Sequence, residues 1–261
     1  MDEDAKHAEI EVYDNEDDTR PNYGSLWDDE HFQQLLDAGP ERSFEQLLRE
    51  HVDDSRVLIL GCGNGHNVQS CMNWNASHVV GIELSATRIS EAAGSIHDER
   101  VAFARADAEE LPFSSDSFDV VISHSVLHHL PNWRVIALEE IRRVLTTDGV
   151  MLVYEPGRYN PAAAVRRRVF PSNIHTVDEQ PFDPTEFESI LSSHFEDVTL
   201  EGHCLISNTL PVISNYFPLK IPLRLTKKIY ELERSLIEGI GYRFSWIITG
   251  VVRSPKPLTS D

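Results

Sequence analysis

Short apolar runs separated by longer amphipathic stretches occupy the first part of this 261-residue chain. A short, continuous apolar run bounded by polar positions is typical of a strand that is buried on both faces, as in a parallel sheet. Two intervening stretches, 85–96 and 133–145, have the apolar spacing of helices; Ser85 is placed to cap the first, and Asp148-Gly149 to end the second. This alternation predicts an α/β fold. The predicted strands are 57–60, 78–82, 101–104, 118–122 and 149–154.

A glycine-rich turn follows the first predicted strand. Val57–Leu60 run directly into Gly-Cys-Gly-Asn-Gly at 61–65, and glycines let a backbone approach a ligand closely. Glu83 closes the second predicted strand, where a carboxylate can accept hydrogen bonds from ribose hydroxyls. Asp107 and Ser123 reach the same edge of the sheet, because the carboxyl ends of parallel strands meet there. The pattern predicts an adenosine-binding βαβ unit.

The spacing of the glycines separates two kinds of adenosine ligand. A dinucleotide site expects Gly-x-Gly-x-x-Gly, with pyrophosphate at the following helix N-terminus. The residue three after Gly63 is His66, so that pattern fails. The shorter Gly-x-Gly-x-Gly suits a ligand that has no pyrophosphate. A nicotinamide-dependent oxidoreductase is therefore disfavoured.

Four stretches, in this order, resemble the class I S-adenosylmethionine-dependent methyltransferases, and specifically the methyltransferase type 11 group. They are VLILGCGNG, VVGIELS, ADAEELPFSSDSFDVVISHSVLHHL and EEIRRVLTTDGVMLVYEP, and they cover about residues 55–156. The resemblance implies a doubly wound, Rossmann-like, seven-stranded and mostly parallel sheet with an antiparallel last strand. It also implies S-adenosyl-L-methionine as cofactor. The cofactor-binding residues that follow from it are Gly61, Cys62, Gly63, Gly65, Glu83, Leu84, Asp107, Ala108 and Ser123.

One position departs from the pattern of this family. The family usually has Asp two residues before the first glycine, where it helps to hold the methionine ammonium, and this chain has Ile59. The ammonium would then meet the carbonyls of Gly61 and Ser123, or a water. Asp107 is expected to accept a hydrogen bond from the exocyclic amine of adenine, while the backbone N–H of Ala108 donates one to a ring nitrogen.

The resemblance also divides the chain into parts. We expect an acidic, disordered arm at 1–22, an N-terminal helical lid at 23–54 and the methyltransferase domain at 55–261. Within the lid, Phe44, Leu47 and Leu48 share one face of a short helix that ends near His51.

The last part of the sheet is expected beyond Pro156. Strands at 195–201 and 244–252 would complete it as an antiparallel pair, preceded by a helix from Pro184 to about Ser193. The segment 205–243 mixes apolar and basic residues, and in this family insertions here shape the acceptor pocket.

The formal net charge of −20 is concentrated at the N-terminus, where residues 1–54 hold 18 acids and 4 bases. Nucleic acid is an unsuitable partner, because neutralising phosphates requires a basic face. The chain has 5 lysines against 18 arginines. This bias toward arginine, together with the surplus of carboxylates, is typical of a salt-loving host. An acidic N-terminal arm that keeps the protein in solution explains the charge equally well.

Three cysteines form neither a disulfide framework nor a zinc signature, which favours a reducing compartment. The sequence shows no N-terminal signal and no apolar run of membrane-spanning length. We therefore expect a soluble, cytoplasmic protein without a metal, with peripheral lipid contact through 205–243 left open.

The candidate catalytic residues follow the fourth predicted strand. Methyl transfer from a sulfonium depends mainly on alignment, and a base is needed only when the acceptor must lose a proton. His128 is the first choice for that base and His124 the second; four residues apart, they would share one face if the segment is helical. Glu155, at the end of the fifth strand, orients the acceptor or pairs with Arg158.

The run Arg166–Arg168 recognises an anionic group on the acceptor or forms a solvated helix face. We expect a methyltransferase acting on a small-molecule acceptor, lipid- or sugar-linked acceptors included, with oxygen as the favoured atom. The alternative is a protein that binds S-adenosylmethionine or S-adenosylhomocysteine without transferase activity, which Ile59 favours.

Overall fold

The structure is a computed structural model that describes residues 6, 10, 39–161, 163, 164, 181–207, 210 and 221–256. The predicted arm, apart from Lys6 and Ile10, and the first half of the predicted lid (23–38) lie outside the described residues, as does the run Arg166–Arg168.

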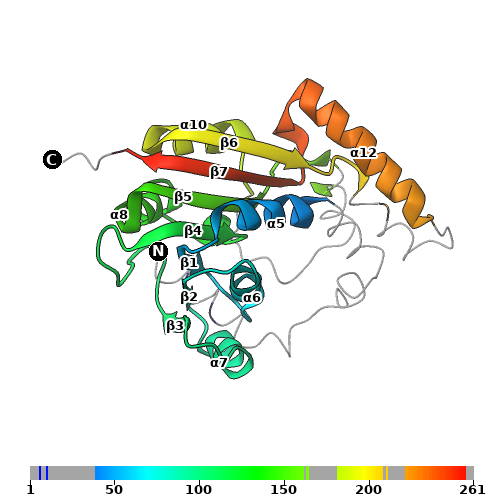
Figure 1. Cartoon of the computed structure of the whole chain (residues 1–261). Helices are drawn as coiled ribbons and strands as arrows, with labels where there is room; N and C mark the ends of the chain where they lie inside the picture. Colours follow the sequence, from blue (N-terminus) through cyan, green and yellow to red (C-terminus); the bar gives the residue numbers. More distant parts are fainter. Residues whose placement is uncertain are drawn as a thin grey trace.

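A seven-stranded mixed sheet forms the centre of the described part of the chain (Figure 1). Its order is β3-β2-β1-β4-β5-β7-β6; the first five strands in this order pair in parallel, and β7 is antiparallel to both β5 and β6. This confirms the predicted fold class. The strands are β1 (Arg56–Leu60), β2 (His78–Glu83), β3 (Val101–Arg105), β4 (Phe118–His124), β5 (Leu145–Pro156), β6 (Phe195–His203) and β7 (Ile247–Pro255).

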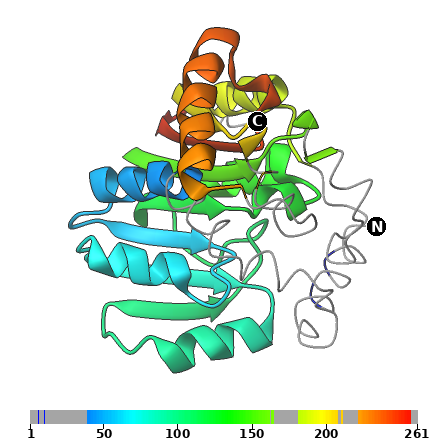
Figure 2. The same ribbon diagram turned by 90° about the vertical axis from the view of Figure 1, so that its right-hand side faces the viewer.

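Helices cover both faces of the sheet because alternate strand residues point to opposite sides and both sets are apolar. One buried cluster joins the sheet to α5 and α6, and another joins it to α8 and α10. Figure 2 shows α6 and α7 beside the β1–β3 part of the sheet and α12 at the opposite end. The helices are α5 (Pro40–His51), α6 (His66–Asn73), α7 (Ala86–Ser95), α8 (Leu138–Val144), α10 (Pro184–His194) and α12 (Leu223–Ile240).

Local capping agrees with two helix starts that the sequence predicts. The Ser85 hydroxyl accepts from the N–H of Arg88 at 3.2 Å and caps α7. Asp183 accepts from the N–H of Thr185 at 3.0 Å, and Pro184 then takes the first position of α10. The predicted helix ending near His51 is α5.

The junction between α8 and β5 differs from the sequence prediction. The helix ends at Val144 and the strand begins at Leu145, before Asp148-Gly149. Leu145 is extended, is 2% exposed and pairs with Phe118, so burial of this side chain outweighs the turn signal of Asp-Gly. The predicted helix also starts differently, because Trp133–Ala137 form a π-helical turn.

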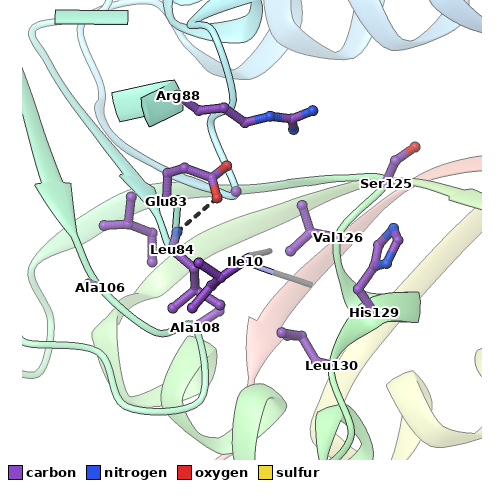
Figure 3. Close-up of a pocket in the computed structure, with 12 residues that line it drawn as sticks. Ile10, Glu83, Leu84, Arg88, Ala106, Ala108, Ser125, Val126, His129 and Leu130 are labelled. Carbon is purple, nitrogen blue, oxygen red and sulfur yellow. Dashed lines mark hydrogen bonds between the residues drawn. The ribbon is translucent and has the colours of Figure 1, made fainter. Parts of the chain in front are cut away.

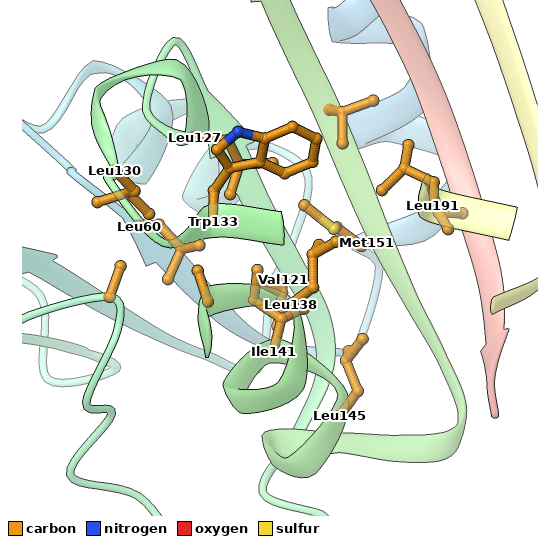
Figure 4. Close-up of a cluster of buried hydrophobic side chains, with 14 of the residues drawn as sticks. Leu60, Val121, Leu127, Leu130, Trp133, Leu138, Ile141, Leu145, Met151 and Leu191 are labelled. Atoms are coloured by element: carbon orange, nitrogen blue, oxygen red, sulfur yellow. The ribbon is translucent and has the colours of Figure 1, made fainter. Parts of the chain in front are cut away.

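The hydrophobic core fixes the loop that follows β4. Leu127 and Leu130 on this loop pack in the same cluster as Leu60, Trp133 and Leu138 (Figure 4). Leu127 is fully buried, which holds the short 3₁₀ turn Leu127–His129 against the sheet edge. The core therefore positions the two histidines of that turn.

The segment 205–243 contributes α12, which contacts β6. No described helix combines the length and apolar character needed to cross a membrane.

Candidate active site

The glycine turn after β1 has a backbone that requires glycine. Gly61 has φ +53°, and a Cβ there would lie 2.6 Å from Cγ2 of Val126. Gly63 also has a positive φ, of +52°, but its Cβ position is open, with Arg88 Nη1 the nearest atom at 3.9 Å. The turn therefore packs tightly against the loop after β4 at Gly61 and leaves space for a ligand at Gly63.

Glu83 at the end of β2 holds this turn. Its Oε2 accepts from the N–H of Gly63 at 3.1 Å, and its Oε1 accepts from the N–H groups of Leu84 and Ser85 at 2.8 and 3.1 Å. A carboxylate has about four acceptor positions, so one on Oε2 is left for a ligand hydroxyl. Glu83 thus shapes the glycine turn in addition to its predicted role toward a ribose.

A pocket opens between the glycine turn, the end of β2 and the loop after β4 (Figure 3). It brings together four of the predicted cofactor-binding residues: Gly61, Glu83, Leu84 and Ala108. Its other lining residues are Ile10, Ile82, Arg88, Ala106, Ser125, Val126, His129 and Leu130.

Two of the predicted residues have their side chains committed elsewhere. The hydroxyl of Ser123 donates to Glu155 Oε1 at 2.8 Å, within the buried interior. Cys62 is buried on the α5–α6 side, and burial, followed by the charge of Glu83, raises the pKa of its thiol to about 12. Cys62 therefore remains a protonated packing residue, and any contact with a cofactor would come from its backbone.

Asp107, the predicted adenine ligand, already has two partners. Its Oδ1 accepts from the N–H of Glu109 at 2.8 Å, and its Oδ2 accepts from Lys6 Nζ at 2.6 Å. Lys6 also lies 2.6 Å from Glu109 Oε2. Asp107 therefore has a structural role as well as a position beside the pocket-lining Ala108.

A buried carboxylate–imidazole pair lies behind the pocket. Glu155 is fully buried; its Oε2 is 2.7 Å from Nδ1 of His128, while its Oε1 accepts from the N–H groups of Val126 and Leu127 at 3.1 and 3.0 Å. With Ser123 these contacts saturate the carboxylate. The sequence predicted that Glu155 orients the acceptor or pairs with Arg158. In the structure its carboxylate instead binds the loop after β4 and the His128 ring.

His124 belongs to a separate cluster. Its ring stacks on Tyr154 with centroids 4.1 Å apart and 13° between planes, and its Nε2 is 3.6 Å from Glu41 Oε2. His124 ends β4, whereas His128 lies in the 3₁₀ turn, so the two do not share one helix face. His124 and Tyr154 point to one face of the sheet, whereas their strand neighbours Ser123 and Glu155 point to the other, where Glu155 contacts His128.

Sequence reasoning missed two residues of the site. His129 lines the pocket, although its neighbour His128 was the preferred candidate. Glu41 reaches the sheet edge from α5, and nothing in the local sequence distinguishes it from the other acids of that region. The described residues contain no cluster of three side chains that could hold a metal ion.

Comparison with known proteins agrees with this geometry. Residues 58–153 match the family model of a methyltransferase domain. The 27-O-demethylrifamycin SV methyltransferase of Amycolatopsis mediterranei is 37% identical over 131 residues, which are 47% of this chain and 46% of that protein. The chain thus spans about half the length of the curated relatives it matches.

Two solved structures share the fold. A chain from the complex between the Trm112 methyltransferase activator of Haloferax volcanii and a methyltransferase has a TM-score of 0.63 at 16% identity, over 92% of this chain and 99% of that one. Phosphoethanolamine N-methyltransferase 2 of Haemonchus contortus was solved in complex with phosphomonomethylethanolamine and S-adenosylhomocysteine. It has a TM-score of 0.57 at 20% identity, over 82% of this chain and 53% of that one. At these identities the likeness concerns the fold alone.

Proposed function

Because this chain belongs to the class I S-adenosylmethionine-dependent methyltransferases, we propose that it transfers the methyl group of S-adenosyl-L-methionine to a hydroxyl of a small-molecule acceptor. The observation that carries the proposal is the pocket in which the glycine turn, Glu83 and Ala108 converge at one edge of the sheet. This is the edge where ligands bind in doubly wound folds.

The residues of the pocket fit the cofactor. Glu83 keeps one acceptor position on Oε2 for a ribose hydroxyl, and the open Cβ position of Gly63 leaves room for the backbone to approach the ligand. The N–H of Ala108 and the carboxylate of Asp107 would serve the adenine. The apolar walls of Ile82, Val126 and Leu130 would exclude water from the ring.

The cofactor supplies a methyl group on a sulfonium, which is already a good leaving group. The task left for the protein is to hold an acceptor in line, and fixed near-attack geometry contributes up to roughly 7–11 kcal/mol. The short turn Leu127–His129 is suited to this because Leu127 is fully buried and Glu155 holds the N–H groups at its start.

We assign the removal of the acceptor proton to His128. A carboxylate on Nδ1 selects the tautomer in which that nitrogen carries the proton, so the Nε2 lone pair can accept one. Glu155 Oε2 is placed for this at 2.7 Å. His129, whose ring centroid is 4.0 Å from that of His128, would form the wall that the acceptor contacts.

An oxygen acceptor is supported by the relatives. The 27-O-demethylrifamycin SV methyltransferase acts, by its name, on an O-demethyl compound. The part of this chain that matches the methyltransferase family model, 58–153, contains the cofactor motifs and His128. The acidic surface implied by a net charge of −20 is consistent with a small acceptor and inconsistent with a nucleic acid.

The test is transfer of label from methyl-labelled S-adenosylmethionine to a panel of hydroxylated small molecules, read as labelled product and an equal amount of S-adenosylhomocysteine. Product formation supports the proposal. Binding of S-adenosylhomocysteine with no transfer to any panel member would favour the second candidate function, a cofactor-binding protein, to which the buried Ile59 in place of a carboxylate points.

A further inference from the structure

A carboxylate from before the first strand lies at the ligand-binding edge of the sheet. Glu41 is in the first turn of α5, and its Oε2 is 3.6 Å from Nε2 of His124 at the end of β4. The hydroxyl of Tyr154 on β5 and the ring of His66 also act on this carboxyl group. His66 begins α6, directly after the glycine turn. Glu41 therefore lies close to the β1, β4 and β5 ends of this edge.

The surroundings of Glu41 are rigid. The His124 ring is stacked on Tyr154, and Phe44 packs edge-on against both, with centroids at 5.1 Å from His124 and 5.8 Å from Tyr154. Phe44 is one helical turn along α5 from Glu41 and is 2% exposed. The carboxylate is consequently fixed by packing while its side chain keeps 31% exposure.

Glu41 is anionic at neutral pH. Burial raises the pKa of its carboxyl, but the interactions with His124, with the Tyr154 hydroxyl and with His66 outweigh burial, and the pKa is lower than that of an ordinary glutamate. Among the described residues no lysine or arginine forms an ion pair with it. Within the described part of the chain, the negative charge is thus held at the sheet edge without a permanently cationic partner.

The order of the strands indicates which part of the cofactor comes near this charge. Glu83 at the end of β2 and Ala108 after β3 would bind the adenosine side, and Gly61 lies directly after β1. The next strands along the edge are β4 and β5. An S-adenosylmethionine whose adenosine lies at β2 and β3 would direct its amino-acid end across β1 toward β4, on the side of Glu41.

The other carboxylates of this region are not suited to an ammonium. Ile59 supplies none, and its side chain is fully buried in the cluster that contains Phe44 and Leu48. Glu155 is fully buried and already has contacts to Ser123, Val126, Leu127 and His128.

We propose that Glu41 binds the ammonium group of the cofactor's amino-acid end, in the role that Ile59 cannot perform. The proposal rests on the proposed function, because it concerns the same cofactor. It gives α5 a place in the binding site, and it separates the Glu41–His124 cluster, which would contact the amino acid, from the Glu155–His128 pair, which would act on the acceptor.

The test compares two ligands that differ only at the amino-acid end. S-adenosylhomocysteine carries the ammonium, and 5′-methylthioadenosine has the same adenosine and thioether without it. Calorimetric titration of Glu41→Gln should show a loss of S-adenosylhomocysteine affinity of about 10–150-fold, the range of a hydrogen bond to a charged group, with 5′-methylthioadenosine affinity unchanged. The matched control is Glu50→Gln, which removes the same charge from an exposed position of α5 and should alter neither affinity.

The two ligands also keep the test decisive. Binding of 5′-methylthioadenosine shows that the variant has a folded pocket. If Glu41→Gln binds neither ligand, Glu41→Asp, which shortens the side chain but keeps its charge, takes its place and should show the selective loss. In the variant tested, an affinity for S-adenosylhomocysteine equal to that of the parent, or a partial loss that is equal for both ligands, would overturn the inference, as would loss of both ligands by Glu41→Asp as well. A parent chain that binds neither ligand would contradict the proposed function itself.

Discussion

Glu155 Oε2 lies 2.7 Å from His128 Nδ1, and both side chains are buried. The same carboxylate holds the hydroxyl of Ser123 and the N–H groups of Val126 and Leu127 through its other oxygen. One buried glutamate therefore sets both the path of the loop after β4 and the tautomer of the imidazole on it.

Glu155→Gln separates these two functions. The amide oxygen can still accept at the Oε1 position, but the amide N–H₂ would face Nδ1 of His128 and favour the tautomer with its proton on Nε2. We expect kcat to fall by about 10²-fold or more while the affinity for S-adenosylhomocysteine is retained. Steady-state kinetics with an identified acceptor and calorimetry check this. Unchanged kcat with a lower melting temperature would leave Glu155 a purely structural role.

His128→Ala tests the base directly, with His129→Ala as its neighbour control. Removal of His128 should lower kcat by roughly 10²-fold or more without changing cofactor affinity, because a base acts only in the transition state. The parent rate should also decrease on acidification, since a protonated imidazole cannot accept a proton, and His128→Ala should lose that dependence.

Loss of the pocket-lining His129 should instead raise the acceptor KM with the acid dependence intact. If His129→Ala loses kcat and the acid dependence while His128→Ala only raises the acceptor KM, His129 would be the base.

Much of this fold could be predicted from the sequence because apolar runs report burial directly. The strand ending at Leu60 and the one ending at Glu83 are bounded by a glycine turn and a carboxylate, so the sequence predicted both the strands and the pocket edge. The site beyond the cofactor could not be predicted in the same way. Glu41 reaches His124 only through tertiary packing of α5, and the direction of the His128 and His129 rings depends on a 3₁₀ turn with no sequence period of its own.

Gly61→Ala should destabilise the fold through the glycine turn. The added Cβ would lie 2.6 Å from Val126 Cγ2, at a φ of +53° that side chains rarely adopt. We expect a loss of about 2–4 kcal/mol in the free energy of unfolding, measured by urea titration. Gly94→Ala in α7 is the control, because no atom lies within 4 Å of its Cβ position, and it should stabilise by about 0.5–1 kcal/mol. Equal effects of the two changes would contradict the described turn.

His203 should make stability depend on acid pH. Burial lowers the pKa of this imidazole to about 4, with opposing effects from Glu201, which raises it, and Arg234, which lowers it. The ring nitrogens lie 3.1 Å from Tyr230 Oη and 2.8 Å from Thr249 Oγ1. An ordinary histidine titrates near pH 6.5, so between pH 6.5 and about 4 the unfolded chain binds a proton that the folded chain does not.

Stability should therefore fall as pH decreases through this window, by an amount on the order of 3 kcal/mol from His203 alone. Urea unfolding of the parent and of His203→Asn at pH 7 and pH 4.5 measures it. His203→Asn should lower stability at pH 7 and show a smaller decrease on acidification. The same pH dependence in both proteins would place the titration on other groups.

The most direct test of the central claim is calorimetric titration of the parent and of Glu83→Gln with S-adenosylhomocysteine and NAD. The parent should bind one S-adenosylhomocysteine per chain and no NAD, because the turn Gly61–Gly65 lacks the dinucleotide spacing. Glu83→Gln keeps one oxygen for the N–H groups of Leu84 and Ser85, but its amide nitrogen would face the N–H of Gly63, and the charged acceptor for a ribose hydroxyl is lost. Its affinity should fall by the equivalent of about 1.5–3 kcal/mol, roughly 10–150-fold. A parent that binds NAD in preference to S-adenosylhomocysteine, or a Glu83→Gln variant that binds it as tightly as the parent, would contradict the account.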